Sequence, residues 1–513
     1  MFKSPCMSLK DILGEDYAKA LCASAVYNGY VTMEEAEKIV SEKIDFMPEE
    51  RQTANEKMLS DVGTQVVDAF ETTNNGAATD AFAKALHKCM SPLSARGLCR
   101  IGEDGKVYFI GKSEHYHASL GHGFGGYKLI DNARKLGVPN ATHNNTRGYI
   151  TRLAERELIR AANGGVCDAE LEKILASREP KVLNRCINLE TGSLACEAGF
   201  KMMLSRFYKL DGTFADPKYY GKTPVFFVMA DMKGTNEANY HGTTIFAQTL
   251  RGLWGGFAAE AEKAGLYKIV PVMINDLADF EEKLKTYNSG NYKTAGFAHE
   301  IILMNYGAIR LTKEYLQGAY KLCREYDTPT MCDEIQSCMW YDGMFLFRKW
   351  GLNPDFAVVG KGFPGGEYPA SKLITTAEMD ALNLFGALVT NGQEELASLA
   401  YLVTMEFSKA NSEEIKDAGE YFYENLEKIA EENSELIVRA DGFGHLAGLR
   451  FAKVDEAAKF AQILNDMCVD ISAQLYKANC PPVVLVKPPL IASRYAMDFL
   501  CGKIKEAIKV MEK

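Results

Sequence analysis

The chain has 513 residues, of which 47% are hydrophobic and 25% charged, and its net charge is −10. This composition is typical of a soluble globular protein, and the length predicts two or three lobes rather than a single core. The acidic balance argues against a protein that binds nucleic acid or an anionic membrane, because both partners require clustered positive charge.

The 13 cysteines are scattered, with no CxxC pair and no Cys/His spacing of the zinc type. We therefore expect no metal site, no disulfide framework and a reducing compartment. The N-terminal sequence MFKSPCMSLKDILGED lacks the apolar core of a signal peptide. No apolar run approaches the roughly 20 residues of a membrane span. A cytoplasmic protein with no membrane partner is expected.

Residues 1–95 are predicted to form a helical extension. Thr32 to Glu35 resembles a capping box, Pro48 opens another charged helix, and Asn74-Asn75-Gly76 interrupts the next one. The segment carries no chemical signature. We expect it to pack on the body of the protein or at a subunit contact.

Residues 96–150 are expected to join a smaller lobe, and they contain Asp104-Gly105, a hairpin turn signal. From 151 to 395 strands and helices alternate, which predicts a large, doubly wound, mostly parallel α/β sheet domain. The predicted strands are 182–190, 224–230, 299–304, 329–335 and 356–359. The predicted helices include 193–208, 311–326 and one that Asn144-Asn145-Thr146 caps and that runs to about Ala162. Residues 396–513, with two helices, a strand pair near 442–451 and a closing helix, predict a smaller α+β domain.

Two charged residues follow buried strands between Pro329 and Pro369. Asp333 ends one apolar run, and Lys361 follows the next one inside a glycine-rich turn. Ligands of parallel sheets bind beyond the carboxyl ends of the strands, so an acid and a lysine placed there can share one ligand. A lysine that forms a Schiff base and a carboxylate that faces a ring nitrogen are what pyridoxal phosphate chemistry needs. Taken alone, Asp333 also suits a helix N-cap and Lys361 a surface lysine.

Further segments fit the same cofactor. Glu190 to Glu197 is a small-residue turn that leads into a helix, whose N–H groups and Ser193 hydroxyl form a candidate anion site. Tyr240 is a candidate for stacking on the cofactor ring, and Gln336 for donating to its phenolic oxygen. Each segment alone also suits a capped helix or a loop anchor.

In this order and spacing the segments resemble the class III (acetylornithine and 4-aminobutyrate type) aminotransferases of fold type I. The resemblance covers roughly residues 97 to 513 and is carried by ETGSLACEAGFK, ANYHGTT, CDEIQ, GLNPDFAVVGKGFPGGEYP, TNGQEELASLA and VKPPLI. It implies pyridoxal 5'-phosphate as the cofactor and a homodimer with shared active sites.

The resemblance also implies a role for each matching position. Lys361 would hold the cofactor as a Schiff base and move the proton, while Asp333 would face the pyridine nitrogen and Gln336 the phenolic oxygen. The remaining cofactor contacts would be Gly192 and Ser193 at the phosphate, Tyr240 on the ring with His241 beside it, and Thr390 reaching the phosphate of the neighbouring subunit.

The substrate-facing motifs depart from the family pattern. The arginine of its "R-L-x-P-P-L" falls on Leu485, and the glutamate of its "E-P-V" has no counterpart at 304–306. A paired loss is expected, because either charge left alone would be costly. The candidate substrate contacts are Tyr116, Arg147, Trp340 and Tyr341, with Lys487 as a second candidate for binding a carboxylate.

We therefore expect an aminotransferase that moves an amino group between an amino acid or amine and an oxo acid or aldehyde through the Lys361 Schiff base. An epimerase or aminomutase of the same family stays open, because the same cofactor shell serves those reactions. A dinucleotide-dependent oxidoreductase is disfavoured, because no G-x-G-x-x-G follows the first strands. The sequence does not identify the amino donor or acceptor.

Overall fold

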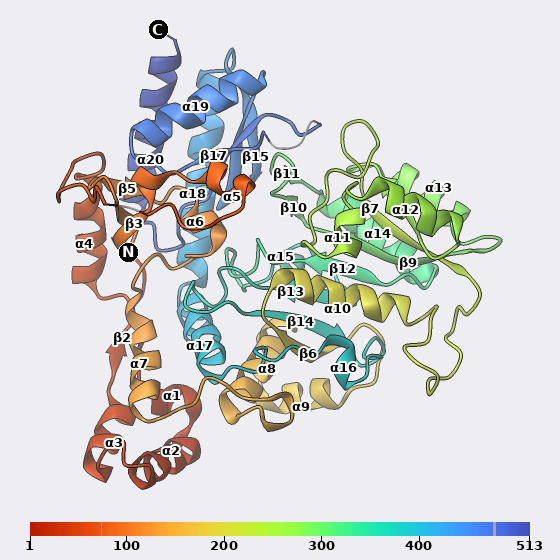
Figure 1. The fold of residues 1–513 in the computed structure, drawn as a ribbon, viewed down its shortest axis with the longest axis horizontal. Helices are drawn as coiled ribbons and strands as arrows, with labels where there is room; N and C mark the ends of the chain where they lie inside the picture. Colours follow the sequence, from red (N-terminus) through yellow and green to blue (C-terminus); the bar gives the residue numbers. More distant parts are fainter. Residues whose placement is uncertain (73, 476–478, 513) are drawn as a thin grey trace.

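The computed structural model describes residues 1–72, 74–475 and 479–512 (Figure 1). Its central feature is a seven-stranded sheet in the order β6, β14, β13, β12, β9, β7, β8. The bounds are β6 Leu183–Leu189, β14 Ser371–Thr376, β13 Phe356–Val359, β12 Thr330–Asp333, β9 Tyr292–His299, β7 Thr223–Met229 and β8 Lys268–Val272. All neighbouring pairs are parallel except the two that β14 makes, with β6 and β13. The predicted mostly parallel sheet is confirmed.

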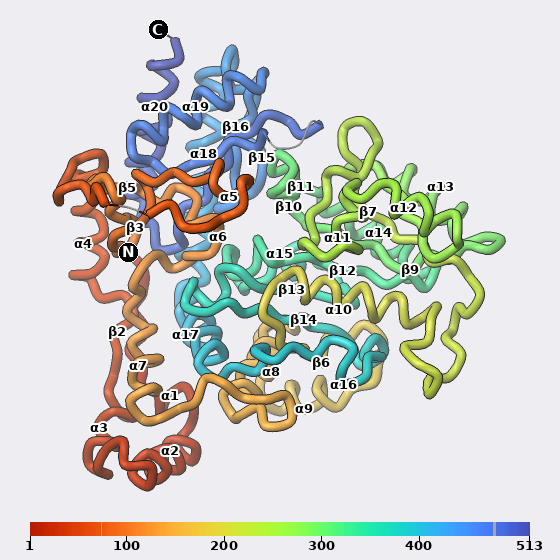
Figure 2. Tube along the Cα trace, in the orientation of Figure 1, coloured from red at the N-terminus to blue at the C-terminus, as the bar shows by residue number. Residues whose placement is uncertain are grey.

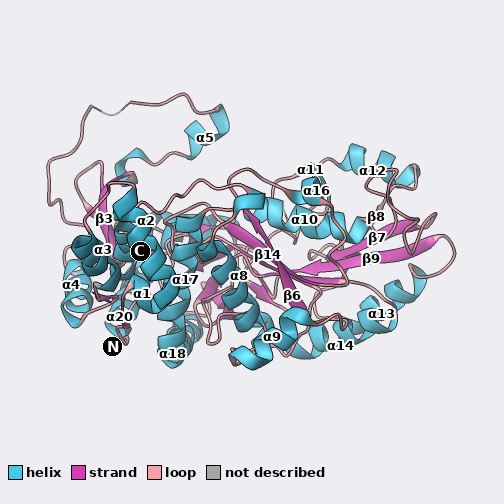
Figure 3. Cartoon of the chain, turned by 90° about the horizontal axis from the view of Figure 1, so that it is seen from below, coloured by secondary structure: helices cyan, strands magenta, loops and turns pink. Residues whose placement is uncertain are grey.

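Helices cover both faces of this sheet, as Figure 3 shows. One face carries α10 (Gly192–Leu204), α11 (Ile245–Thr249), α12 (Gly255–Lys263) and α16 (Leu384–Ala387). The other carries α8 (Tyr149–Ala162), α9 (Asp168–Ala176), α13 (Leu277–Thr286) and α14 (Lys313–Glu325). This arrangement leaves the carboxyl ends of the parallel strands open for a ligand.

The predicted strand at 299–304 is wrong. Strand β9 ends at His299, and the apolar residues beyond it form only the short β10 (Ile302–Leu303), which pairs with β11 (Ile309–Arg310). The sequence of β9 is less apolar because it contains Gly296, which lies against Met203 of α10. A Cβ at position 296 would sit 2.3 Å from the Met203 sulfur, so close packing against α10 requires a glycine within this strand.

The predicted helix ends at Ala162 as expected, but the prediction that Asn144, Asn145 and Thr146 cap it is wrong. Residues Asn144–Thr146 form a 3₁₀ turn, and α8 begins at Tyr149. The Glu395 carboxylate caps the helix from a distant part of the chain, accepting hydrogen bonds at 2.9 Å from the N–H groups of Gly148 and Ile150. Glu395, which is distant in the sequence, therefore caps the helix in place of the local asparagines.

A four-stranded antiparallel sheet, in the order β15, β16, β18, β17, forms the core of a smaller lobe. Its strands are β15 Ile437–Phe443, β16 Leu446–Phe451, β17 Ser472–Ala473 and β18 Val483–Val486, and its helices are α17 Glu395–Ala410, α18 Ser412–Glu432, α19 Val454–Asp466 and α20 Arg494–Met511. The predicted strand pair is β15–β16. The hairpin predicted at Asp104-Gly105 joins β4 (Cys99–Gly102) to β5 (Val107–Phe109), with β3 (Pro92–Arg96) as the third strand.

The N-terminal region is mainly helical between Leu9 and Leu59 and lies beside α7 (Lys128–Lys135) and α20 (Figure 2). Its elements are β1 Cys6–Met7, α1 Leu9–Leu13, α2 Glu15–Tyr27, α3 Met33–Ser41, β2 Ile44–Asp45 and α4 Glu49–Leu59, followed by α5 Asp80–Ala85. The prediction that helices continue to residue 95 is wrong: among the described residues from 60 to 95, only α5 and a 3₁₀ turn at Lys88–Met90 are helical, and a strand begins at Pro92. Thr32 caps α3 in the predicted capping box with Glu35. Two further short helices are α6 Ser113–Tyr116 and α15 Leu346–Lys349. In the part of the chain that the structure describes, no helix is both long and apolar enough to cross a membrane.

Candidate active site

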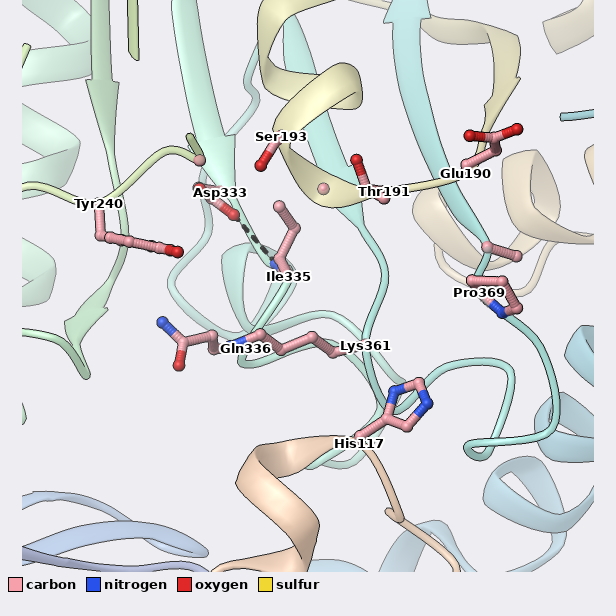
Figure 4. A pocket seen from close by; sticks show the side chains of 13 residues that line it. His117, Glu190, Thr191, Ser193, Tyr240, Asp333, Ile335, Gln336, Lys361 and Pro369 are labelled. Carbon is pink, nitrogen blue, oxygen red and sulfur yellow. Dashed lines mark hydrogen bonds between the residues drawn. The ribbon is translucent and has the colours of Figure 1, made fainter. Parts of the chain in front are cut away.

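A cavity of about 270 Å³ lies beyond the carboxyl ends of β6, β7, β12 and β13 (Figure 4). Most of the residues predicted to bind a cofactor line it together. The described lining residues are His117, Glu190, Thr191, Gly192, Ser193, Tyr240, Gly242, Asp333, Ile335, Gln336, Lys361, Pro369 and Ala370. The topology therefore brings Lys361 and Asp333 to one cavity, as the sequence predicted.

Lys361 stands on a constrained turn after β13. Its backbone has φ of +46°, the left-handed region that a side chain occupies at a cost of roughly 1–3 kcal/mol. The following Gly362 is packed so closely that a Cβ there would lie 2.8 Å from the Cβ of Ser119, whose hydroxyl donates to the Gly362 carbonyl. Desolvation lowers the pKa of Lys361 to about 8, although Glu300 and Asp333 act in the opposite direction.

Asp333, the last residue of β12, is almost completely buried. Its Oδ2 accepts hydrogen bonds from Nδ1 of His241 at 2.9 Å and from the thiol of Cys196 at 3.5 Å, and its Oδ1 accepts from the Ile335 N–H at 3.1 Å. Cys196, His241 and Asp333 place three possible metal-ligand atoms within 4.8 Å of one another. Hydrogen bonds among these groups account for their proximity. They fix the orientation of the carboxylate.

The N-terminus of α10 forms one wall of the cavity. Thr191 caps this helix, and the hydroxyl of Ser193 accepts a hydrogen bond at 3.0 Å from the N–H of Thr243, in the loop after β7. Two positions of this wall are packed too closely for any residue but glycine: a Cβ at Gly192 would lie 2.4 Å from Ile335, and one at Gly242 would lie 2.6 Å from the Cα of Ser193. Backbone N–H groups and a hydroxyl at a helix N-terminus suit an anion.

Two residues that sequence reasoning missed lie beside the predicted ones. The Arg251 guanidinium lies 5.0 Å from the centroid of the Tyr240 ring, and Glu300 accepts a hydrogen bond at 2.8 Å from the Gln336 amide. The glutamate of the family's "E-P-V" was sought at 304–306, whereas β9 ends at His299 and Glu300 follows it directly. The expected loss of the family's acid stays a prediction. An acidic residue directly after a buried strand is the sequence signal that could have identified Glu300.

Several predicted residues lie away from the cavity. Thr390 is exposed and is not among the residues that line it. Arg147 is exposed and pairs with Glu155 at 3.1 Å. Tyr341 is buried, with its hydroxyl donating to the Phe443 carbonyl at 2.6 Å.

Tyr116, Trp340 and Lys487 are buried next to the cavity without lining it. The Lys487 amine lies 4.0 Å from the Trp340 ring centroid and 4.2 Å from that of Tyr116. Tyr116 is also a neighbour of the cavity-lining Lys361, whose Nζ lies 5.2 Å from its ring centroid.

A family model described as aminotransferase class-III matches residues 159–508. The relatives include a putrescine aminotransferase of Pectobacterium atrosepticum, 26% identical over 50% of this chain and 57% of its own length, and an ornithine aminotransferase of Bacillus subtilis, 28% identical over 53% and 64%. These alignments thus span about three fifths of the length of the relatives.

Among solved structures, an adenosylmethionine-8-amino-7-oxononanoate aminotransferase from Methanocaldococcus jannaschii has a TM-score of 0.66 at 20% identity, covering 89% of this chain and 99% of its own. An aminotransferase from Vibrio fluvialis has the same TM-score at 16% identity, covering 86% and 96%. These structures share the fold.

Proposed function

The chain belongs to the class III aminotransferases, and from this premise we propose that it is a pyridoxal-phosphate-dependent aminotransferase that moves an amino group between an amino acid or amine and an oxo acid or aldehyde. The observation that carries the proposal is that Lys361 and Asp333 line one cavity at the carboxyl ends of adjacent parallel strands. The matched family and the relatives are aminotransferases, which favours transamination over epimerisation.

The residues present fit pyridoxal phosphate. The cavity offers an amine on Lys361, a carboxylate on Asp333, an aromatic ring on Tyr240 and the N-terminus of α10 at Gly192 and Ser193. A Cβ at Gly192 would collide with Ile335, and one at Gly242 would collide with Ser193, so any larger residue would displace cavity-lining residues. Among the described residues, Oε1 of Gln336 and Nε2 of His241 are buried without a hydrogen-bond partner. A polar ring in the cavity would satisfy the Gln336 oxygen.

When bound, pyridoxal phosphate supplies an electron sink for the α-carbon of the substrate. Nζ of Lys361 would bind the cofactor covalently and, once released, carry the proton. Asp333 would hold a proton at the ring nitrogen, because His241, Cys196 and the Ile335 N–H keep its carboxylate oriented.

The other proposed contacts orient the cofactor. Gly192 and Ser193 would bind the phosphate, Tyr240 would lie on the ring, and His241 and Gln336 would act from its edges. Arg251 on the Tyr240 ring and Glu300 on the Gln336 amide would hold those two side chains in place.

We also propose a homodimer with shared active sites. Thr390 is exposed and away from the cavity of its own chain, which suits a residue that reaches the phosphate of a second subunit. The helices α11, α12 and α16 lie on the same sheet face as α10, and large apolar side chains in or next to them are exposed; they are Ile245, Trp254, Phe257, Leu384 and Phe385. A second copy would cover them.

We place the protein in the cytoplasm. All 13 cysteines are free thiols, several of them exposed. An oxidising compartment favours disulfides, so this set of thiols supports a reducing one.

The direct test is a half-reaction with the purified protein and no carbonyl acceptor. Amines are added one at a time, starting with ornithine and putrescine, and conversion of the bound cofactor to pyridoxamine phosphate is followed by absorbance and mass spectrometry. Conversion is expected with at least one amine. A protein that binds no pyridoxal phosphate would overturn the proposal.

The variant Lys361→Ala should lose both the covalent cofactor and turnover. The control Lys293→Ala removes another buried lysine, in β9, that bonds Asn288 and Tyr326 instead of the cavity. It should retain cofactor and activity. Turnover by Lys361→Ala at the wild-type rate would contradict the assignment.

A further inference from the structure

Lys487, directly after β18, is a fully buried lysine. Buried lysines are rare and are normally paired with an acid. Within the residues that the structure describes, its Nζ forms no ion pair with a carboxylate: it donates to the Gln336 carbonyl, and Glu300 acts on it only through its charge. The position therefore holds an amine where a hydrophobic side chain would cost less, which points to a function.

The amine and backbone of Lys487 join three parts of the chain. Its Nζ donates to the carbonyl of Gln336 at 2.5 Å, in the turn that follows β12. Its backbone N–H donates to the Gly111 carbonyl at 3.0 Å, and its own carbonyl accepts from the Ser113 hydroxyl at 2.5 Å. The smaller lobe, the segment before α6 and the turn beside the cavity meet at this residue.

Lys487 and Lys361 share one aromatic neighbour. The ring centroid of Tyr116 lies 4.2 Å from Nζ of Lys487 and 5.2 Å from Nζ of Lys361. Tyr116 ends a run of left-handed residues that starts at Ser113, with φ between 50° and 72°. Such a run persists only where its surroundings enforce it, and the Ser113 bond to Lys487 is one such restraint.

The charges around Lys487 favour its neutral form. Burial and the neighbouring Lys361 lower its pKa far below the usual range, against opposing effects of Cys338 and Glu300. The charged or titratable groups that face it are Lys361, Glu300, Cys338, His115 and His445. An uncharged amine still donates to the Gln336 carbonyl.

We propose that Lys487 is a positioning residue for the reaction: it ties the smaller lobe to the Gln336 turn and holds the Tyr116 ring under the amine of Lys361. This inference rests on the proposed function, because it assigns Lys487 a role toward the cofactor and Lys361. This positioning role explains why a lysine, rather than an apolar residue, occupies a fully buried position.

The test compares Lys487→Met with the control Lys293→Met. Methionine keeps the length and burial of the side chain but loses the donor. Lys293 is also buried and also donates to a backbone carbonyl, that of Tyr326, but it lies at the opposite end of β9 from the cavity. Each full chain is freed of cofactor, and its dissociation constant for pyridoxal phosphate, kcat, KM and unfolding temperature are measured.

Lys487→Met is expected to weaken cofactor binding and lower kcat by about tenfold or more, with a smaller change in KM for the amine. Lys293→Met should lower only the unfolding temperature. Equal cofactor affinity and kcat in the two variants would reduce Lys487 to a structural residue and overturn the inference. Failure of the proposed function is distinguishable, because the wild-type protein itself would then bind no pyridoxal phosphate.

Lys487→Arg provides a second variant if Lys487→Met does not fold. Arginine keeps a donor for the Gln336 carbonyl but places a permanent charge beside Lys361. The pH at which Lys361 becomes reactive, followed by mass spectrometry of reductive methylation, should move down by about one unit, because a like charge disfavours the protonated amine. An unchanged midpoint would contradict the proposed proximity of the two amines.

Discussion

At the residue scale, Asp333 receives hydrogen bonds from three donors before any ligand binds. These are His241, Cys196 and the Ile335 N–H. They stabilise the ionised carboxylate in one orientation and offset the cost of burying it. The carboxylate is thus prepared to stabilise a positive charge in the cavity.

Replacing this charge should affect catalysis more than binding. We predict that Asp333→Asn keeps the cofactor attached to Lys361 but lowers kcat by roughly 10²–10³-fold, the size found for loss of one preorganised electrostatic group. The control Asp441→Asn neutralises a buried acid of the smaller lobe that pairs with Arg439 and Arg450. It should change stability rather than kcat, and wild-type kcat in Asp333→Asn would refute the assigned role.

The amine of Lys361 gives a pH dependence of defined sign. Its pKa is lowered to about 8, so the amine is mostly protonated at pH 7 and mostly neutral at pH 9. Only the neutral amine has the lone pair that attacks a carbonyl. Capture of pyridoxal phosphate by the cofactor-free protein should therefore rise about tenfold per pH unit below 8 and level off above it. A stopped-flow midpoint near that of a free lysine would contradict this prediction.

At the element scale, the cavity wall is built from the start of α10 and the loop after β7. The N–H of Thr243 donates to the Ser193 hydroxyl, and the hydroxyl of Thr244, which caps α11, donates to Glu197 of α10 at 2.7 Å. The two elements therefore support each other. A change in the loop should disturb the anion site on the helix.

Two glycines of this loop offer a matched pair of variants. Gly242 has φ of +109° and Gly234 has φ of +78°, so alanine is strained at both by roughly 1–3 kcal/mol. Only at Gly242 does the added Cβ meet Ser193, whereas nothing lies within 4 Å of the Cβ at Gly234. We predict that Gly242→Ala loses affinity for pyridoxal phosphate and for inorganic phosphate, measured by calorimetry. Gly234→Ala should bind both normally; equal losses would exclude a specific effect on the anion site.

At the scale of the whole molecule, α11, α12 and α16 lie on one side of the large domain (Figure 3), and exposed apolar side chains occur in or next to each of these helices. Phe385 is the most exposed of them, at 81%. Burying one phenylalanine stabilises an interface by about 1.5–3 kcal/mol. That amount corresponds to roughly a tenfold to hundredfold change in the dissociation constant of a dimer.

We therefore predict that Phe385→Asp shifts the protein from dimer to monomer in analytical ultracentrifugation and lowers activity at dilute concentrations. Activity should fall with the dimer because Thr390 would serve the neighbouring subunit. Tyr27→Asp is the control, since Tyr27 is 91% exposed at the end of α2, among the N-terminal helices. A wild-type protein that sediments as a monomer would refute the proposed assembly.

The amino-acid sequence by itself determined the elements that depend on local pattern. The apolar runs before Asp333 and Lys361 specify two buried strands, and the glycines around Lys361 allow its strained turn. Parallel strands align their carboxyl ends, so the meeting of these two side chains at one cavity followed from pattern and topology alone.

Only the tertiary structure decided which distant side chains support the cavity residues and the helix ends. The Glu300–Gln336 and Lys487–Gln336 hydrogen bonds join residues 36 and 151 positions apart, and the cap of α8 comes from Glu395, 245 positions from Ile150. The partners of long polar side chains are set by tertiary packing, and the local hydrophobic periodicity of the sequence does not predict them. An apolar run was likewise mistaken for β9, whose sequence contains Gly296 because Met203 of α10 packs closely against that position.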